Sequence, residues 1–580
     1  MLSDSPVVRS LGPRTLFLAT AIITTAILLW IRQIAESGRL IGLSFIFFYQ
    51  FVDQDHWATV LELLILVAAI FLAPKVPTRA ILRAAGEHPR TIAAIAAVIL
   101  SAGTLFVYHD HPLSMDEYAA YFQSQVFAAG HITGQFPLPL KDWLIPPGFQ
   151  KAFLLISHVS GHVASQYWPG HALIMAPFAL LGVPWACNPV LSALTLLVIH
   201  RLAMHMFEDV EAAGLALLLT IASPVIFGLG ISYYSMPAHL LANSLYALLL
   251  IRPAPLRTFM AGVVGSVALC LHNPVPHALF AVPWLLWTAR QPNGTRLVGL
   301  LFAGYLPLFV LLGVGWFELS NHLRNEASEN RVAMGVGDRV QEMLSLFSLP
   351  DVTLLLARLI GVAKAWIWAV PGLLILACYG AVRWYHNTLC RLFVASALTT
   401  LIGYVLYPLD QGHGWGNRYF HSAWMALPLL ATAAIFRPAW RGPVQTADAT
   451  ADRPAGLFED SDTRQFIATC ALLTLILGVG WRAWQMQHFM YKDVTQVPSY
   501  RGTERRVVII DTHSSFYGAD LVQNDPWLRG NVIRMFSHGF AADAKMMGQY
   551  FPEMHRVYAD PFGTVWSTAQ QPVHTRTASP

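Results

Sequence analysis

The sequence has few charged residues and few cysteines for its length. Only 12% of its 580 residues are Asp, Glu, Lys or Arg, whereas 55% are hydrophobic and 12% are aromatic. The mean hydropathy of +0.49 lies far outside the balance of soluble domains. This composition excludes an ordinary soluble enzyme and predicts a polytopic α-helical membrane protein.

Other signatures are missing as well. The net charge of +4 is spread over loops without a Lys/Arg tract, so we expect no nucleic-acid partner. The five cysteines form no CxxC pair and lie in or beside apolar runs, which is typical of small buried side chains. His109 and His111 form the only HxH pattern, in a predicted loop. We therefore expect no cofactor, although the many histidines leave a divalent metal open.

Apolar runs and the short basic loops between them predict the topology. A run of roughly 17 to 22 residues can cross a hydrocarbon core about 30 Å thick, and we count about thirteen crossings. The basic stretch KVPTRAILRAAGEHPR, residues 75–90, follows the second run and is cytoplasmic by the positive-inside rule. The N-terminus is then cytoplasmic, and the third run, about 91–108, leads outward. Later basic loops keep this parity only if the segment 171–184 is an interfacial or re-entrant helix.

The outer segments have distinct characters. The stretch ISHVSGHVASQY predicts a hairpin around Gly161. Near the C-terminus, RRVVIID, NVIRMF and HRVYAD are three strand-like runs, which predict a small α/β domain on the outer side. The predicted divisions are N-terminal transmembrane helices and a cytoplasmic loop (1–90), a transmembrane catalytic core (91–440) with outer loops 109–170 and 317–356, a cytoplasmic linker with the last transmembrane helix (441–484), and the outer domain (485–580).

Two adjacent carboxylates, Asp116 and Glu117, follow the third apolar run in HPLSMDEYAAYFQSQVFAAGH. The topology places them on the outer surface, at the start of an interfacial helix that continues through Phe127. The positive end of the helix dipole favours anions there. A carboxylate at this boundary could take a proton from an acceptor hydroxyl, while a phosphate leaving group would need a basic partner. Spacing alone fits a solvated surface loop equally well.

The order of three segments carries a resemblance to a known family. MDEYAAYFQSQVFAAGHI is followed by SQYWPGHALIMAPFALLGVPWACNPVL and later by DQGHGWGNRYFHSAWMALPLL. Over roughly residues 90–440 the chain resembles GT-C superfamily glycosyltransferases, more narrowly the bacterial family 39/83-like members related to aminoarabinose transferases and protein O-mannosyltransferases. The resemblance implies an inverting transferase in the bacterial inner (plasma) membrane with a periplasmic active site. Its donor would be a polyprenyl-phosphate-linked sugar, and its acceptor a lipid, a polysaccharide or a protein.

The same resemblance implies roles for single residues. Asp116 would be the catalytic base, and Glu117 its neighbour in the cavity. Related enzymes bind the lipid phosphate with a basic residue near a YPPG-like stretch, whereas this chain has Ser165 and Gln166 before its YWPGH. The candidates for phosphate binding are therefore Arg418, His413 and His171. Residues expected to line the cavity are Tyr118, Tyr167, Tyr419, Tyr234, His239 and His272.

Two other functions remain open. Many crossings with intramembrane Pro and Gly also fit a transporter or flippase of a lipid-linked sugar. We expect the span centres to be nearly free of charge and detect no inverted halves, and both features argue against transport. A polysaccharide ligase or polymerase of another fold is a lesser alternative, because the second outer loop has three arginines but a single histidine.

Overall fold

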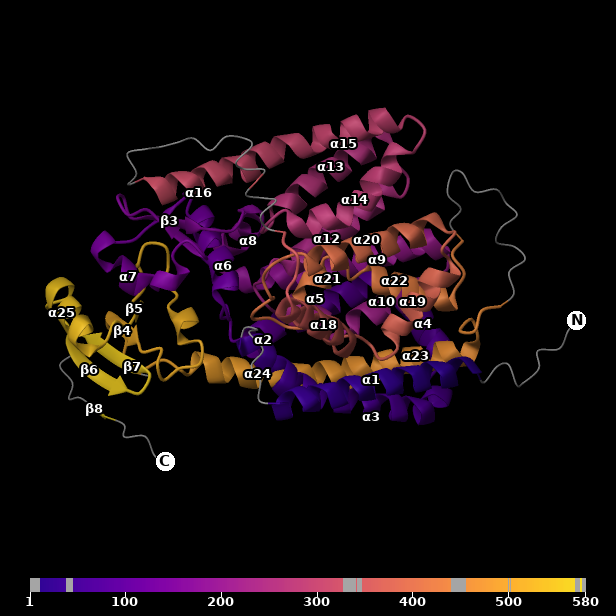
Figure 1. Cartoon of the computed structure of the whole chain (residues 1–580), viewed down its shortest axis with the longest axis horizontal. Coiled ribbons are helices and arrows are strands. Elements are labelled where there is room, and N and C mark those ends of the chain that lie inside the picture. Colours follow the sequence, from indigo (N-terminus) through magenta and orange to yellow (C-terminus); the bar gives the residue numbers. More distant parts are fainter. Residues whose placement is uncertain are drawn as a thin grey trace, which may run out of the picture.

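The computed structural model describes residues 11–37, 45–326, 341, 347–439, 455–498, 500, 502–568 and 574–575. It is a bundle of apolar helices with a small sheet at one end (Figure 1). Most of the described residues are helical, and a small sheet domain lies at the C-terminus, as the sequence predicts. About half of the second outer loop, 317–356, and much of the linker lie outside the described residues.

Seven helices in the described part of the chain are long and apolar enough to cross a membrane. The count rises to eight if α10 (Val210–Ile221) and α11 (Pro224–Gly230), bent by 59°, form one broken span. The predicted count of thirteen is not confirmed, because the remaining apolar helices are shorter. The long spans are Leu11–Ser37 (α1), Ile46–Lys75 (with α3, His56–Leu72), Pro89–Phe106 (α5), Pro184–Phe207 (with α9, Cys187–Phe207), Gly294–Arg324 (α15, Gly294–Leu308, to α16, Gly315–Asn325), Thr388–Val405 (α20) and Ser461–Val494 (α23, Ser461–Leu473, to α24, Val479–Val494).

Short polar caps mark where several helices begin. Asp209 accepts a hydrogen bond from the Ala212 amide at the start of α10, and Asp351 accepts one from the Leu354 amide at the start of α18 (Val352–Ile367). Such caps satisfy amides that have no partner within the helix. The shorter apolar helices are α8 (Gly170–Leu180), α12 (Met236–Leu250), α13 (Pro255–Cys270), α14 (Val275–Ala289), α19 (Leu373–Arg383) and α22 (Ala426–Ile435).

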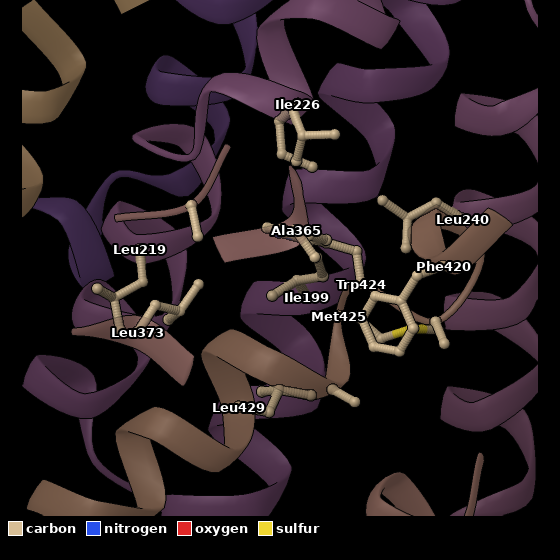
Figure 2. Close-up of a cluster of buried hydrophobic side chains, with 14 of the residues drawn as sticks. Ile199, Leu219, Ile226, Leu240, Ala365, Leu373, Phe420, Trp424, Met425 and Leu429 are labelled. Atoms are coloured by element: carbon tan, nitrogen blue, oxygen red, sulfur yellow. The ribbon is translucent and has the colours of Figure 1, made fainter. Parts of the chain in front are cut away.

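One apolar core joins these helices behind the outer surface. Figure 2 shows Ile199, Leu240, Phe420 and Trp424 converging from α9, α12, α21 (Arg418–His421) and the turn before α22. Trp424 is fully buried. Close packing of such large side chains stabilises the association of apolar helices in a membrane through van der Waals contacts. This packing fixes the chain immediately after Arg418.

The first outer segment folds as the sequence predicts. The interfacial helix is α6 (Met115–Ala128), and the hairpin is the antiparallel pair β2 (Leu154–Ile156) and β3 (His162–Ser165). β1 (Gly134–Gln135) extends this sheet. The segment 171–184 contains the 11-residue helix α8, which is too short to cross a membrane.

The C-terminal domain contains the three predicted strands β4 (Arg506–Ile510), β5 (Val532–Phe536) and β6 (His555–Asp560). β7 (Gly563–Ser567) and β8 (His574–Thr575) complete a sheet of order β5-β4-β7-β6-β8, accompanied by α25 (Phe540–Tyr550). Its apolar face shares a core with α6 and α25. The helix α24 continues past position 484 to Val494.

Three charged side chains are buried together inside the bundle, although none lies at the centre of one of the seven long spans. Asp55, in the span Ile46–Lys75, lies 2.7 Å from Lys364 Nζ of α18 and 2.8 Å from Arg482 of α24. All three side chains are at most 2% exposed. The three charges are paired with one another, and a small cavity of about 10 Å³ beside Arg482 is also lined by Glu62. The cluster therefore ties the second and last spans to α18.

Candidate active site

Asp116 of α6 and Arg418 of α21 form an ion pair. Both terminal nitrogens of the guanidinium donate to Oδ2 of Asp116, at 3.2 and 3.1 Å. The Asp116 side chain is 24% exposed and that of Arg418 is 6% exposed. The sequence predicted both residues, and the structure brings them together. A partly accessible carboxylate therefore faces a nearly buried guanidinium.

The loop before α21 shapes the position of Arg418. The side-chain oxygen of Gln411 accepts a hydrogen bond from the Arg418 backbone amide at 3.0 Å. The side-chain nitrogen of Gln411 donates a hydrogen bond to the Gly416 carbonyl at 2.8 Å. A guanidinium nitrogen also donates to the Gln411 carbonyl. At Gly414, with φ of +121°, a Cβ would lie 2.4 Å from Cδ of Arg418. The glycine is thus required by the arginine side chain itself.

Aromatic groups surround the ion pair. The Tyr167 hydroxyl donates to Asp116, and the Tyr167 ring packs on His272 at 3.9 Å between centroids. The Arg418 guanidinium lies 4.3 Å from the centroid of the Tyr234 ring, a favourable cation–π contact. Tyr167, His272 and Tyr234, which were predicted to line the substrate cavity, therefore lie next to the Asp116–Arg418 ion pair.

The electrostatics keep Asp116 ionised. Burial raises the pKa of Asp116, but the Arg418 guanidinium, His272 and the Tyr167 hydroxyl outweigh it, so the pKa lies below its ordinary value. Burial and the Asp116 charge raise the pKa of Tyr167 well above its usual range. Burial lowers the pKa of His272 to about 4. At neutral pH the site thus contains a carboxylate, a guanidinium, a neutral phenol and a neutral imidazole.

Glu117 points away from Asp116 and is fully buried. It accepts from the amides of Leu113 and Tyr233, both at 2.8 Å, and from the Tyr108 hydroxyl at 3.1 Å. Burial raises the pKa of Glu117 to about 8, despite these hydrogen bonds. The geometry fixes the turn that enters α6 and favours a positioning role for Glu117, rather than the predicted place beside the substrate.

The other predicted residues lie around the pair without contacting Asp116. His413 faces the C-terminal domain, with Nε2 3.6 Å from Asp520. His171 and His239 are buried behind the site, where His171 Nε2 meets the Tyr233 carbonyl at 3.2 Å. The Tyr118 hydroxyl bonds to Asn524 of the C-terminal domain, with the Asn524 amide donating to it at 2.7 Å.

An apolar cavity of about 290 Å³ lies beside the Arg418 loop. Gln411, Asn417 and Tyr419 line its polar end, and residues of α18 and α20 form its walls. Leu359 of α18 lines the cavity and is 59% exposed, so the cavity reaches the surface of the bundle. The cavity can hold an apolar chain with its polar end near Arg358, Gln411, Asn417 and Tyr419, of which the last two adjoin Arg418 in the sequence.

Sequence reasoning missed several residues of this region. Arg358 of α18 lines the cavity, and its guanidinium donates to the Leu409 carbonyl at 2.6 Å and lies 5.2 Å from the Tyr419 ring centroid. Asn417 donates to the Gly361 carbonyl at 2.8 Å and so joins the loop to α18. The sequence did contain a pattern that could have identified Arg358, because it is a charged residue within the apolar run VTLLLARLIGVAKAWI. Charged residues in such runs are energetically costly and often functional. In the described ranges, no group of three or more His, Cys, Asp or Glu side chains could hold a metal ion.

Comparisons with known proteins bear on the fold. No protein-family model matches the chain, and no curated protein matches it by sequence. Its structure is similar to that of ArnT from Cupriavidus metallidurans bound to undecaprenyl phosphate, with a TM-score of 0.51 and 13% identity over 83% of this chain and 98% of ArnT. The apo structure of the same ArnT matches with a TM-score of 0.44 and 12% identity over 83% of this chain and 97% of ArnT. The chain therefore has the GT-C type membrane fold that the sequence predicted.

Proposed function

We propose that the protein is a membrane glycosyltransferase that moves a sugar from a polyprenyl-phosphate donor to an acceptor hydroxyl, with inversion. The observation that carries the proposal is the Asp116–Arg418 ion pair beside an apolar cavity that reaches the surface of the bundle. A carboxylate can accept the acceptor's proton, and a guanidinium can bind a phosphate through two hydrogen bonds. The apolar cavity would receive the first part of the polyprenyl chain.

The ion pair suggests how donor binding would prepare the base. In the absence of the sugar donor, Arg418 donates both hydrogen bonds to Asp116 and keeps the pKa of Asp116 low. A donor phosphate at Arg418 would compete for the same guanidinium. Once Arg418 turns to the phosphate, the Asp116 carboxylate loses its partner and becomes a stronger base. The acceptor's proton is then taken only when the donor is present.

The reaction conserves atoms and charge in one step. Asp116 takes the proton of the acceptor hydroxyl while that oxygen forms a bond to the anomeric carbon of the sugar. The bond between this carbon and the donor phosphate oxygen breaks, and the polyprenyl phosphate departs with the electron pair. Arg418 stabilises the charge that develops on the phosphate. Attack opposite the leaving group inverts the anomeric configuration.

Further support comes from the comparison with ArnT, whose structure contains undecaprenyl phosphate. We place this chain's site at the periplasmic face of the bacterial inner membrane, with the N-terminus cytoplasmic and the C-terminal domain periplasmic. A lipid, a polysaccharide and a protein are all open as acceptors. The proposed roles are base for Asp116, phosphate binding for Arg418, and a hydrogen bond from Tyr167 that holds Asp116 in place.

Reconstituted vesicles test transfer against transport. The purified protein is placed in vesicles with a polyprenyl-phosphate-linked sugar and candidate acceptors, and products are followed by mass spectrometry. We expect a covalent sugar–acceptor product and free polyprenyl phosphate. Movement of the intact donor across the vesicle membrane without any covalent product would reject the transferase and support a flippase.

A further inference from the structure

The C-terminal domain reaches into the proposed active site through one short segment. This segment, residues 517–524, contains the single turn η9 (Gly518–Leu521) and lies against the entry to α6. The Gln523 side chain donates to the Pro112 carbonyl at 2.8 Å, and the Asn524 amide donates to the Tyr118 hydroxyl at 2.7 Å. The domain therefore contacts both sides of the helix start that carries Asp116.

Asp520 supplies the cap of α6. Its Oδ1 accepts from the amide of Met115, the first residue of the helix, at 2.8 Å. The local N-cap residue, Ser114, makes no capping bond, because its hydroxyl pairs with the Tyr234 hydroxyl at 2.9 Å. An unpartnered amide at a helix start is stabilised by a side-chain acceptor, and a carboxylate also suits the positive end of the helix dipole. A residue 405 positions away thus replaces the local cap.

The second oxygen of Asp520 faces the loop that carries Arg418. Oδ2 lies 3.6 Å from Nε2 of His413, and the His413 ring packs edge-on against Tyr517 at 4.6 Å between centroids. The side chains of Asp520 and His413 are 8% and 10% exposed. One buried carboxylate therefore touches both elements whose side chains form the Asp116–Arg418 pair.

We propose that Asp520 is a positioning residue that holds α6 and the 411–418 loop in register, so that the C-terminal domain completes the active site. This inference rests on the proposed transferase function. Asp520 does not touch the ion pair itself and acts through Met115 and His413. Loss of the side chain should slow transfer much more than it weakens donor binding, because the hydrogen bonds from Arg418 to Gln411 still hold the guanidinium in place.

A role in domain attachment alone would give a different result, and Asp543 provides the matched control. Asp543 is a second buried carboxylate of the same domain, and it accepts from Trp143 of the first outer segment at 3.0 Å. It also accepts from the His538 amide at 3.0 Å, within its own domain. Asp543→Ala therefore weakens domain packing without touching α6 or the 411–418 loop.

The test combines steady-state kinetics with amide hydrogen exchange on the full-length protein. Kinetics of sugar transfer are measured for Asp520→Ala, Asp520→Asn and Asp543→Ala, with a polyprenyl-phosphate-linked sugar as donor. We expect kcat to fall at least about tenfold in Asp520→Ala with the donor KM within about twofold. Asp520→Asn keeps an acceptor oxygen for Met115 and should retain kcat within about threefold. Exchange at residues 115–118 should be about fivefold faster in Asp520→Ala and unchanged in Asp543→Ala.

Each outcome decides the inference. Wild-type kcat and wild-type exchange in Asp520→Ala would overturn it, and so would an equal loss of kcat in Asp543→Ala. If the alanine variant does not fold, Asp520→Asn decides, because a tenfold loss of kcat in that folded variant contradicts the capping role. If the wild-type protein transfers no sugar, the proposed function fails, while hydrogen exchange still tests the contact between Asp520 and α6.

Discussion

Arg418 donates two hydrogen bonds to a single oxygen of Asp116, across 302 positions of the chain. The two residues come from the MDEY and GHGWGNRY segments, which the sequence resemblance placed at one site. Leaving one partner of a buried ion pair uncompensated costs about 3–5 kcal/mol, less where one group is partly exposed, as Asp116 is. The pair is thus held together by its own charges as well as by the loop around Arg418.

Gly414→Ala should damage the site more than Gly412→Ala. Both glycines have positive φ, but Gly412 at +58° lies in the left-handed region, where alanine costs about 1–2 kcal/mol, whereas Gly414 at +121° lies where essentially only glycine is found. Only at Gly414 would the new Cβ collide with the Arg418 side chain, while nothing lies within 4 Å at Gly412. We expect affinity for a polyprenyl phosphate, measured by native mass spectrometry, to fall at least about tenfold in Gly414→Ala alone. Equal losses in the two variants would show that the loop backbone matters and the clash does not.

Leu401→Trp should block the apolar cavity. Leu401 lines the cavity from α20, whereas Leu398 on the same helix does not line it and is 49% exposed. A bulkier side chain at Leu401 would occupy space needed by the polyprenyl chain, so we expect affinity for polyprenyl phosphate to drop at least about tenfold, or about 1.4 kcal/mol. Leu398→Trp is the control and should bind normally. Unchanged binding in Leu401→Trp would place the lipid chain elsewhere.

Glu117 should make folding stability depend on pH. Its pKa is raised to about 8 in the folded protein from an ordinary 4.5, so the folded state holds a proton that the unfolded chain has lost. Stability from this group is therefore greatest below pH 4.5 and decreases as the pH rises through about 8, by at most about 1.4 kcal/mol per pH unit. Thermal unfolding in detergent from pH 5 to 8 should show this slope, and Glu117→Gln should flatten it. Identical slopes in the two proteins would contradict the raised pKa.

Lys364→Met should destabilise the bundle. In the buried cluster of Asp55, Lys364 and Arg482, the substitution removes the ammonium group that pairs with the Asp55 carboxylate. Arg482 is then the remaining ionic partner of Asp55. Breaking such a buried pair costs about 3–5 kcal/mol, whereas the exposed Lys492 should tolerate the same change. The check is the melting temperature of the two variants in the same detergent. A melting temperature within a degree of wild type for Lys364→Met would show that the cluster contributes little.

Local patterns in the sequence predicted the elements around the site well. The interfacial helix after the third apolar run, the hairpin around Gly161 and three strands of the C-terminal domain are all present. These elements depend on apolar periodicity and turn residues that lie close together in the chain. The resemblance to GT-C proteins then placed Asp116 and Arg418 together.

Long-range pairing could not be predicted in the same way. Asp55, Lys364 and Arg482 lie in three helical segments far apart in the chain, and no local pattern shows that their charges meet. Asp116 and Glu117 are adjacent in sequence, but neighbouring residues on a helix point about 100° apart. Asp116 therefore faces Arg418, while Glu117 turns into the protein toward Tyr108.

The most direct test is sugar transfer by Asp116→Asn compared with Asp110→Asn. Asp110 is a neighbouring partly buried carboxyl that bonds to the Tyr233 hydroxyl, outside the ion pair. Both proteins are purified, analysed for bound polyprenyl-phosphate-linked sugar, and assayed for the covalent product. We predict that Asp116→Asn still binds the donor but transfers about 10²- to 10⁴-fold more slowly, whereas Asp110→Asn stays within a few fold of wild type. A wild-type rate of transfer in Asp116→Asn would contradict its role as the base.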